Sequence, residues 1–194
     1  MAQHLIHGFN VIDGGRGSIG KLARWLPEPV PHSYGWVFLL RLRWVNDSTV
    51  RQMLPTIKPG DVLIAHSNGA LIAWRLVMAG APVSAVVCIQ PALRRDTRWP
   101  ETLPVLCLHN PGDLVVEMGR VWGRFASVSQ PWRERHGWGS AGRHGFTSGQ
   151  PMVEHWDTSK SRYPVKRHSG VFKEPALSHW APWIAQWLKS GVAG

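Results

Sequence analysis

Cysteines, acidic residues and long hydrophobic runs are all scarce in this chain of 194 residues. Its two cysteines, Cys88 and Cys107, argue against a disulfide framework, and each lies in an apolar run where a buried, reduced thiol is expected. No apolar run approaches the roughly 20 residues that a membrane-spanning helix needs. The N-terminus also lacks the basic and apolar regions of a signal peptide. We therefore expect a cytoplasmic protein.

Acidic residues are outnumbered by basic ones. The chain has 12 Asp and Glu against 22 Lys and Arg, a net charge of +10, and it contains 12 tryptophans. Basic and aromatic residues together suit nucleic acid or an anionic membrane surface as partner. No nucleic-acid-binding motif is present, so we expect no nucleic-acid partner, while an anionic surface remains open. Length and composition fit a single domain over residues 1–194.

Short apolar runs alternate with helical stretches. The expected strands cover residues 4–6, 35–40, 62–65, 85–89, 105–108 and 152–156. The expected helices cover residues 18–26, 47–57, 69–79, 115–125 and a C-terminal segment with a core-facing stripe of Trp180, Trp183, Ile184, Trp187 and Leu188. Near-continuous apolar strands that alternate with helices indicate an α/β fold with a mainly parallel sheet and helices on both faces.

Residues 131–151 break this alternation. Five glycines lie between Gly137 and Gly149, together with tryptophans, arginines and histidines. Loops of this length in compact domains are usually functional or mobile. We therefore treat this segment as a long loop and a candidate lid.

The segment Ala65-His66-Ser67-Asn68-Gly69 is the most informative part of the sequence. It joins a buried strand to a helix, and small residues stand two places before and two places after the serine. That pattern is typical of a nucleophile elbow, although Ala65 replaces the first glycine. The turn would aim the Asn68 N–H and the helix start at an oxyanion. The alternative is an ordinary helix start capped by Ser67 and Asn68.

A serine nucleophile needs a base, and the base needs a carboxylate that orients it. In strand-turn-helix hydrolases the acid follows a later strand and the histidine precedes the last helix. Asp113 follows the 105–108 run through a Pro-Gly turn, and His168 lies before the C-terminal helix. Asp113 could equally cap the helix that follows it. Asp157 is a weaker candidate for the acid, and Asp96 is expected to pair with neighbouring arginines.

An early loop, His7-Gly8-Phe9-Asn10, supplies a second oxyanion donor. Its glycine lets the backbone approach closely, so the Phe9 N–H would act with Asn68, and Asn10 is an alternative donor. His7, Gly8 and Asn10 are the candidate substrate contacts. A plain turn after an edge strand would explain the same residues. No histidine or cysteine spacing indicates a metal site.

In this order the motifs resemble the α/β-hydrolase superfamily over most of the chain. More narrowly, residues 7–11 and 13–15, the elbow and residues 168–172 look like small hydrolases encoded by bacteriophages and prophages. The resemblance implies a single-domain α/β-hydrolase-like fold without a large cap, no cofactor or metal, and the cytoplasm of a bacterial host. Without a cap the site should be fairly open, with the 131–151 loop as its candidate cover.

The function expected is hydrolysis of a carboxylic ester or thioester through an acyl-Ser67 intermediate, with His168 as base and then acid. An amide substrate is the less favoured option. The alternative is a weakly active or inactive scaffold that binds an anionic partner or membrane surface. Its contact face would be residues 133–168, with seven Lys and Arg against three Asp and Glu, a net charge of +4 (7 − 3). The sequence does not specify the acyl group, the leaving group or the oligomeric state.

Overall fold

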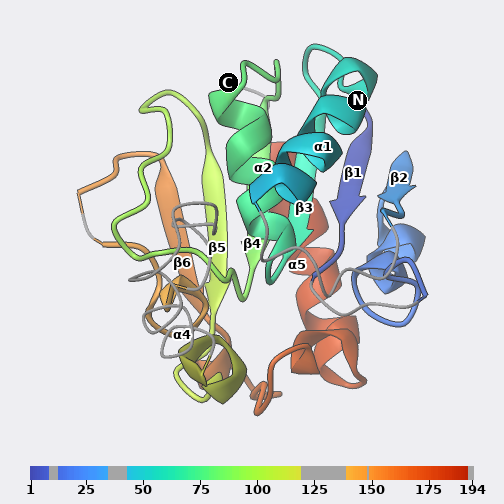
Figure 1. The fold of residues 1–194 in the computed structure, drawn as a ribbon. Helices are drawn as coiled ribbons and strands as arrows, with labels where there is room; N and C mark the ends of the chain where they lie inside the picture. The colour runs from blue at the N-terminus through green and yellow to red at the C-terminus, as the bar shows by residue number, and fades with distance from the viewer. Residues whose placement is uncertain (9–12, 35–42, 119–138, 148, 192–194) are drawn as a thin grey trace.

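Six strands form one sheet in which every neighbouring pair is parallel (Figure 1). The computed structural model describes residues 1–8, 13–34, 43–118, 139–147 and 149–191. The strands are β1 (Gln3–Ile6), β2 (Pro29–His32), β3 (Val62–His66), β4 (Ala85–Ile89), β5 (Val105–His109) and β6 (Val153–Asp157), in the spatial order β2-β1-β3-β4-β5-β6. The predicted parallel α/β fold class is therefore confirmed.

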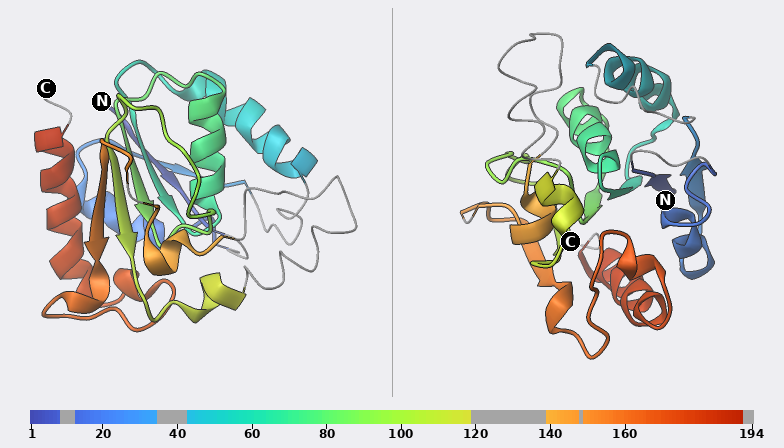
Figure 2. Two further views of the ribbon diagram at one scale, coloured as in Figure 1. Left: turned by 90° about the vertical axis from the view of Figure 1, so that its left-hand side faces the viewer. Right: turned by 60° about the horizontal axis from the view of Figure 1, so that its bottom comes forward.

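Helices cover both faces of the sheet (Figure 2). Helices α1 (Arg43–Met53) and α2 (Gly69–Met78) lie on one face, and α5 (Ala176–Gly191) lies on the other. The 3-10 helices η1 (Ile19–Trp25) and η4 (Gly170–Phe172) pack beside α5. Shorter elements are η2 (Leu54–Thr56), a helical turn over residues 114–118, α4 (Ala141–His144) and η3 (Thr158–Lys160).

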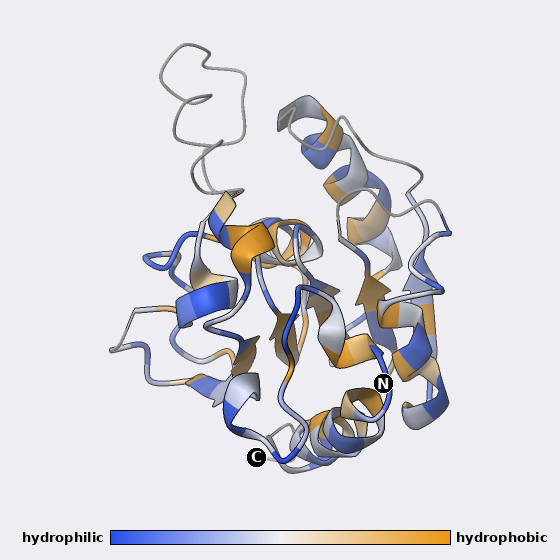
Figure 3. Cartoon of the chain, turned by 90° about the horizontal axis from the view of Figure 1, so that it is seen from below, coloured by the Kyte–Doolittle hydropathy of each residue, from blue (hydrophilic) through white to orange (hydrophobic). Residues whose placement is uncertain are grey.

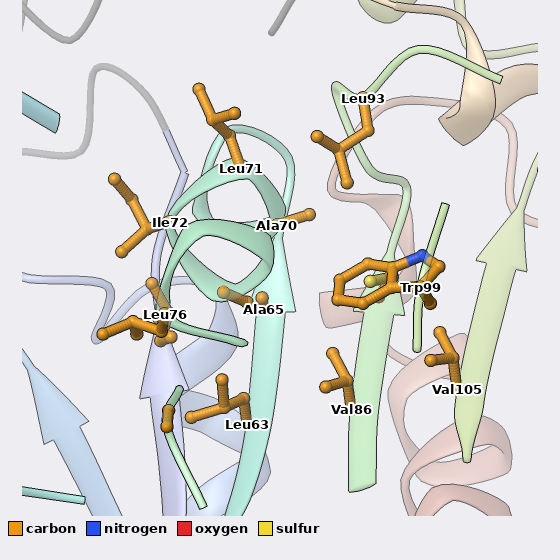
Figure 4. Close-up of a cluster of buried hydrophobic side chains, with 14 of the residues drawn as sticks. Leu63, Ala65, Ala70, Leu71, Ile72, Leu76, Val86, Leu93, Trp99 and Val105 are labelled. Carbon is orange, nitrogen blue, oxygen red and sulfur yellow. The ribbon is translucent and has the colours of Figure 1, made fainter. Parts of the chain in front are cut away.

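The central strands are buried on both sides because alternate residues enter different hydrophobic clusters. In β3, Leu63 and Ala65 pack under α2, while Val62 and Ile64 pack on the α5 side. Figure 4 shows the first of these clusters, with Leu71, Ile72 and Leu76 of α2 above the strands. Each fully buried aliphatic side chain contributes about 1.5–3 kcal/mol. Seen from below, hydrophobic strands occupy the centre and many outer segments are hydrophilic (Figure 3).

The cysteines lie side by side in this core. Cys88 of β4 and Cys107 of β5 are partners in register, and both are free and buried, as predicted. Burial raises the pKa of both thiols, so neither forms a thiolate readily. None of the described helices is long and apolar enough to cross a membrane.

The second strand, β2, lies before the hydrophobic run over residues 35–40 that was predicted to form a strand. Residues 29–32, Pro-Val-Pro-His, form β2 at the edge of the sheet, where a missing N–H is tolerated. The predicted strand over residues 35–40 lies outside the described residues. Hydrophobic pattern alone missed β2 because two prolines oppose a strand everywhere except at an edge.

Two helical predictions need correction. Helix α1 begins at Arg43 rather than at Asp47, whose carboxylate pairs with Arg75 of α2. The short helix predicted over residues 18–26 is present as a 3-10 helix over residues 19–25. In α5, Trp180, Ile184 and Leu188 are buried, but Trp183 is 53% exposed and does not belong to the core stripe.

The predicted loop over residues 131–151 contains helix α4, which is fixed to the connector after β4. Ala141 N–H donates to Leu93 O (3.0 Å) and Gly142 N–H to Pro91 O (2.7 Å). The Gly142 carbonyl accepts from Asn110 N–H at 2.8 Å. The described half of the segment is therefore packed rather than free. Residues 131–138 and 148 lie outside the described residues, so the lid hypothesis stays a prediction.

Candidate active site

The candidate residues gather at the carboxyl ends of β3, β4 and β5, the lower edge of the sheet in Figure 1. Ser67 follows β3, Gln90 follows β4, and Asp113 follows β5 after a short turn. In open α/β sheets ligands bind outside this edge because the loops there converge. The fold thus brings together side chains that are far apart in sequence.

Ser67 occupies a strained turn between β3 and α2. Its φ of 55° is left-handed, a conformation that costs a non-glycine residue about 1–3 kcal/mol. Three backbone hydrogen bonds hold it there: Ser67 N–H donates to Ile89 O (3.0 Å), and Ser67 O accepts from the N–H groups of Ala92 (3.0 Å) and Ala70 (3.2 Å). A Cβ at Gly69 would lie 2.4 Å from Ile6 O, so only glycine fits two places after the serine. The sharp turn predicted for residues 65–69 is present.

Two backbone segments flank Ser67, the end of β1 and the start of α2. A Cβ at Gly8 would lie 2.8 Å from Ser67 Cβ, which places the backbone after β1 directly against the serine. Asn68 stands at the N-terminus of α2, and its N–H has no acceptor among the described residues. That N–H is therefore available to a ligand, and the helix dipole favours a negative charge there. Phe9 and Asn10, predicted as the second donor and its alternative, lie outside the described residues.

His7 supports the loop from beneath. Its ring is fully buried, stacks on Tyr34 with 4.0 Å between ring centroids, and bonds through Nδ1 to Gly8 O at 2.9 Å. Burial lowers its pKa, more than the hydrogen bond to Gly8 raises it. A ring in this position supports the Gly8 backbone rather than offering its own surface to a substrate.

Asp113 and His168 form a hydrogen-bonded pair. His168 Nδ1 lies 2.8 Å from Asp113 Oδ2, and Asp113 is wholly buried while the His168 side chain is 14% exposed. Asp113 Oδ1 also accepts the N–H of Val116 at 3.2 Å, so the carboxylate caps the following helical turn as well. One side chain therefore bonds the histidine and caps the helical turn, and the role of Asp113 as the acid stays a prediction.

Gln90 connects this pair to the backbone on both sides of His168. Its amide nitrogen donates to Asp113 Oδ2 (3.1 Å) and to Arg167 O (3.3 Å), and its oxygen accepts the N–H of Ser169 (3.1 Å). Gln90 is wholly buried and left-handed, with φ of 45°. The sequence analysis missed it because a single glutamine after a strand has no distinctive spacing. Its place after β4, next to the elbow strand, is the signal that could have found it.

His66 lies between the elbow and His168. Its ring centroid is 4.8 Å from that of His168, and its Nε2 is 3.4 Å from Ser169 Oγ. Burial, followed by repulsion from His168 and His7, keeps the pKa of His66 well below its usual range, so its ring is neutral. His66 is buried next to the elbow serine. Its contact with the His168 ring places the Asp113–His168 pair next to the last residue of β3, directly before Ser67.

Ser67 Oγ itself has no hydrogen-bond partner among the described residues. The other acids take structural roles: Asp96 pairs with Arg94 (2.5 and 2.8 Å), as predicted, and Asp157 accepts from Ser159. Within the described part of the chain, no group of three or more His, Cys, Asp or Glu is arranged to hold a metal.

Comparisons with known proteins agree on the fold. No protein-family model and no curated protein matches the chain. Among solved structures it is similar to a protein named as a YdeN-like hydrolase of Pectobacterium atrosepticum (TM-score 0.58, 15% identity, 98% of this chain and 92% of that one). It is also similar to an esterase of Pyrococcus furiosus (TM-score 0.60, 13% identity, 99% and 83%). A third is carboxyl esterase 2 of Tuber melanosporum (TM-score 0.59, 12% identity, 98% and 78%). The chain therefore has the single-domain fold of the α/β-hydrolases.

Proposed function

We propose that this protein is a serine hydrolase that cleaves a carboxylic ester or thioester through an acyl-Ser67 intermediate. The observation that carries the proposal is the 2.8 Å bond between Asp113 and His168, at the sheet edge where Ser67 is held left-handed. A strained serine beside a buried aspartate–histidine pair is the arrangement that activates a hydroxyl nucleophile. Hydrogen bonds from the nucleophile to its base commonly tighten only when substrate binds.

The proton path follows from the bonds of His168. Because Nδ1 faces the Asp113 carboxylate, Nδ1 carries the hydrogen and Nε2 keeps a lone pair. Nε2 takes the proton of Ser67 as its Oγ attacks the acyl carbon. The Asn68 N–H stabilises the oxyanion that forms. The leaving alcohol or thiol then receives the proton from Nε2, and water hydrolyses the acyl-serine with His168 again as base.

The esterase names of similar structures support the choice of an ester as substrate class. They do so only as analogy, because a shared fold does not fix a substrate. The acyl-serine mechanism is proposed from the site residues and not from those names. We also propose the Phe9 N–H as the second oxyanion donor, beside the Asn68 N–H. The resemblance to phage-encoded hydrolases and the cytoplasmic location stay part of this proposal.

Activity-based labelling tests the proposal. A fluorophosphonate reacts with an activated serine but not with an ordinary one, so we expect one adduct, located at Ser67 by peptide mass spectrometry. Thr49, a buried hydroxyl in α1, is the internal control and stays unlabelled. Labelling that is absent, or that persists in Ser67→Ala, would contradict the proposal.

The alternative, an inactive scaffold with an anionic partner, makes the opposite prediction. It expects no labelling together with salt-sensitive binding to polyanions. The bonding of His168 argues against it, because Nδ1 is held by Asp113 while Nε2 has no partner among the described residues and is left to act as a base.

A further inference from the structure

A pocket lies next to His168, formed by neighbouring residues of the same segment and not by His168 itself. It has a volume of about 460 Å³, within the size range of small-molecule sites. Its walls are residues 162–167, residue 170 and residues 173–176. These residues lie between β6 and the first residue of α5, and none of the candidate catalytic residues lines the pocket.

The wall of this pocket carries an excess of positive charge. Four cations line it: Arg162, Lys166, Arg167 and Lys173. None of the four lies within 4 Å of a carboxylate in the described part of the chain. The acid of the pocket, Glu174, is already bonded to Arg24 (2.5 Å) and accepts the N–H of Ser178 (3.1 Å). The charged side chains of the wall that are not already paired are therefore all cations.

The rest of the wall is apolar. Val165 and Ala176 are buried residues, and Tyr163, Pro164 and Pro175 complete the lining. The Tyr163 ring is held edge-on against His179 at 5.7 Å and carries the Arg162 guanidinium at 5.6 Å. An aromatic and aliphatic wall beside cations suits a ligand that has both an anionic group and an apolar body.

The same walls are bonded to the candidate active site. Arg167 O accepts from Gln90 (3.3 Å), the residue that also holds Asp113, and Val165 O accepts from Asn110 Nδ2 beside the acid turn. A ligand that shifts residues 165–167 would therefore act on the peptide next to His168.

We propose that this pocket binds a small organic anion, a phosphate or carboxylate group on an aromatic or aliphatic body, and that its occupancy adjusts the position of His168. The binding itself is independent of the proposed hydrolase activity, whereas the effect on His168 rests on it.

Calorimetry with 1-naphthyl phosphate tests the binding, with Ser67→Ala protein so that no turnover occurs. We expect one site, and at least about tenfold weaker binding in the Arg162→Gln/Lys173→Gln variant, because two charge-assisted contacts are lost. The matched control, Lys58→Gln/Lys189→Gln, removes two exposed cations outside the pocket and should bind within about twofold of the parent. Inorganic phosphate and 1-naphthol, which each supply half of the ligand, should bind more weakly.

Absence of binding at millimolar ligand, or equal loss in both double variants, would overturn the proposal. Should the pocket variant unfold in circular dichroism, the single Lys166→Gln variant carries the same test. If the protein binds 1-naphthyl phosphate in this way but is not labelled by the fluorophosphonate, the proposed binding site is supported and the proposed hydrolase function is refuted. Saturating ligand that leaves ester turnover unchanged in an active protein would refute the effect on His168 alone.

Discussion

Two aspartate–histidine bonds of nearly equal length lie at opposite ends of the sheet. Asp113 and His168 meet at 2.8 Å beyond the carboxyl end of β5, and Asp61 and His4 meet at 3.0 Å at the amino end of β3. In the second pair the other ring nitrogen is already used, because His4 Nδ1 lies 2.7 Å from His32 Nε2. An aspartate–histidine pair is therefore no mark of catalysis by itself; what matters is whether the second nitrogen is free.

The carboxylate of Asp61, like the ring of His4, has its hydrogen-bonding atoms occupied by structural partners. Asp61 also accepts the backbone N–H groups of Ala2 and Lys58, both at 2.8 Å. Burial alone would raise its pKa, but the bond from His4 and those two N–H groups outweigh burial and lower it. This network joins β1, β2 and β3 and is saturated. Backbone strain gathers at the other end instead, where Ser67, Gln90 and Ser169 are all left-handed. We therefore expect the Asp61–His4 pair to stabilise the fold, and we propose the chemistry for the end that holds Asp113 and His168.

Replacement of the nucleophile should produce the largest effect. We expect Ser67→Ala to lower kcat for short p-nitrophenyl esters by at least about 10⁴-fold. The melting temperature should stay within a few degrees, because alanine keeps the turn and loses only a hydroxyl without a partner. Steady-state kinetics and thermal melts check this. Unchanged turnover would remove Ser67 as the nucleophile.

Replacing Asp113 and Asp61 by asparagine, one at a time, separates the roles of the two carboxylates. Asp113→Asn should lower kcat by about 10³–10⁴-fold, since His168 would be held in the wrong tautomer. Asp61→Asn should leave kcat within about twofold and instead lower the free energy of unfolding by about 2–4 kcal/mol, since a buried, bonded carboxylate is lost. Urea unfolding and ester kinetics on both variants give the comparison. Loss of activity in Asp61→Asn with an intact fold would break it.

Gln90 and Gln3, two buried glutamines at opposite ends of the sheet, allow the same comparison with a smaller expected effect. Gln90→Ala should lower kcat by about 10–100-fold with little change in KM, because Asp113 and Ser169 N–H lose the partner that fixes His168. Gln3, bonded to Met1 O and Glu28 N–H at the amino end, is the matched control. Gln3→Ala should lower only stability, by about 1–2 kcal/mol. A normal pH–rate profile and kcat in Gln90→Ala would reduce Gln90 to a packing role.

The smallest expected effect is a pH dependence of stability from the amino end. Burial, then repulsion from His4 and His7, lowers the pKa of His32 to about 4. Between pH 6.5 and about 4 the unfolded chain therefore binds more protons at this position than the folded protein. Stability should be complete above pH 6.5 and fall by about 1–2 kcal/mol as the pH drops to about 4.

Urea unfolding across this pH range measures that effect. His32→Gln keeps a polar partner for His4 and should show a correspondingly smaller fall. Equal slopes in the variant and the parent would assign the pH dependence to other histidines.

Local pattern predicted most of the sheet and the elbow. The runs 62–65, 85–89 and 105–108 are apolar throughout, and only strands covered on both faces require that. The edge strand β2 and the start of α1 were missed, because Pro29, Pro31 and Asp47 have local preferences that tertiary contacts override. Trp183 fits the helical stripe by spacing, yet its side chain is 53% exposed, and spacing alone does not show how far the neighbouring elements extend over a helix.

The sequence by itself determined the parallel α/β order and the identity of a serine, an acid and a histidine, because hydrophobic period and turn residues are local signals. Only the tertiary structure decided which groups meet. It joined Asp113 to His168, bonded Gln90 to Asp113 and to the backbone on either side of His168, buried His7, and formed the similar pair Asp61–His4 at the other end of the sheet. The physical reason is that a side chain's role depends on burial and on which of its atoms still lack a partner, and neither quantity exists until distant segments pack together.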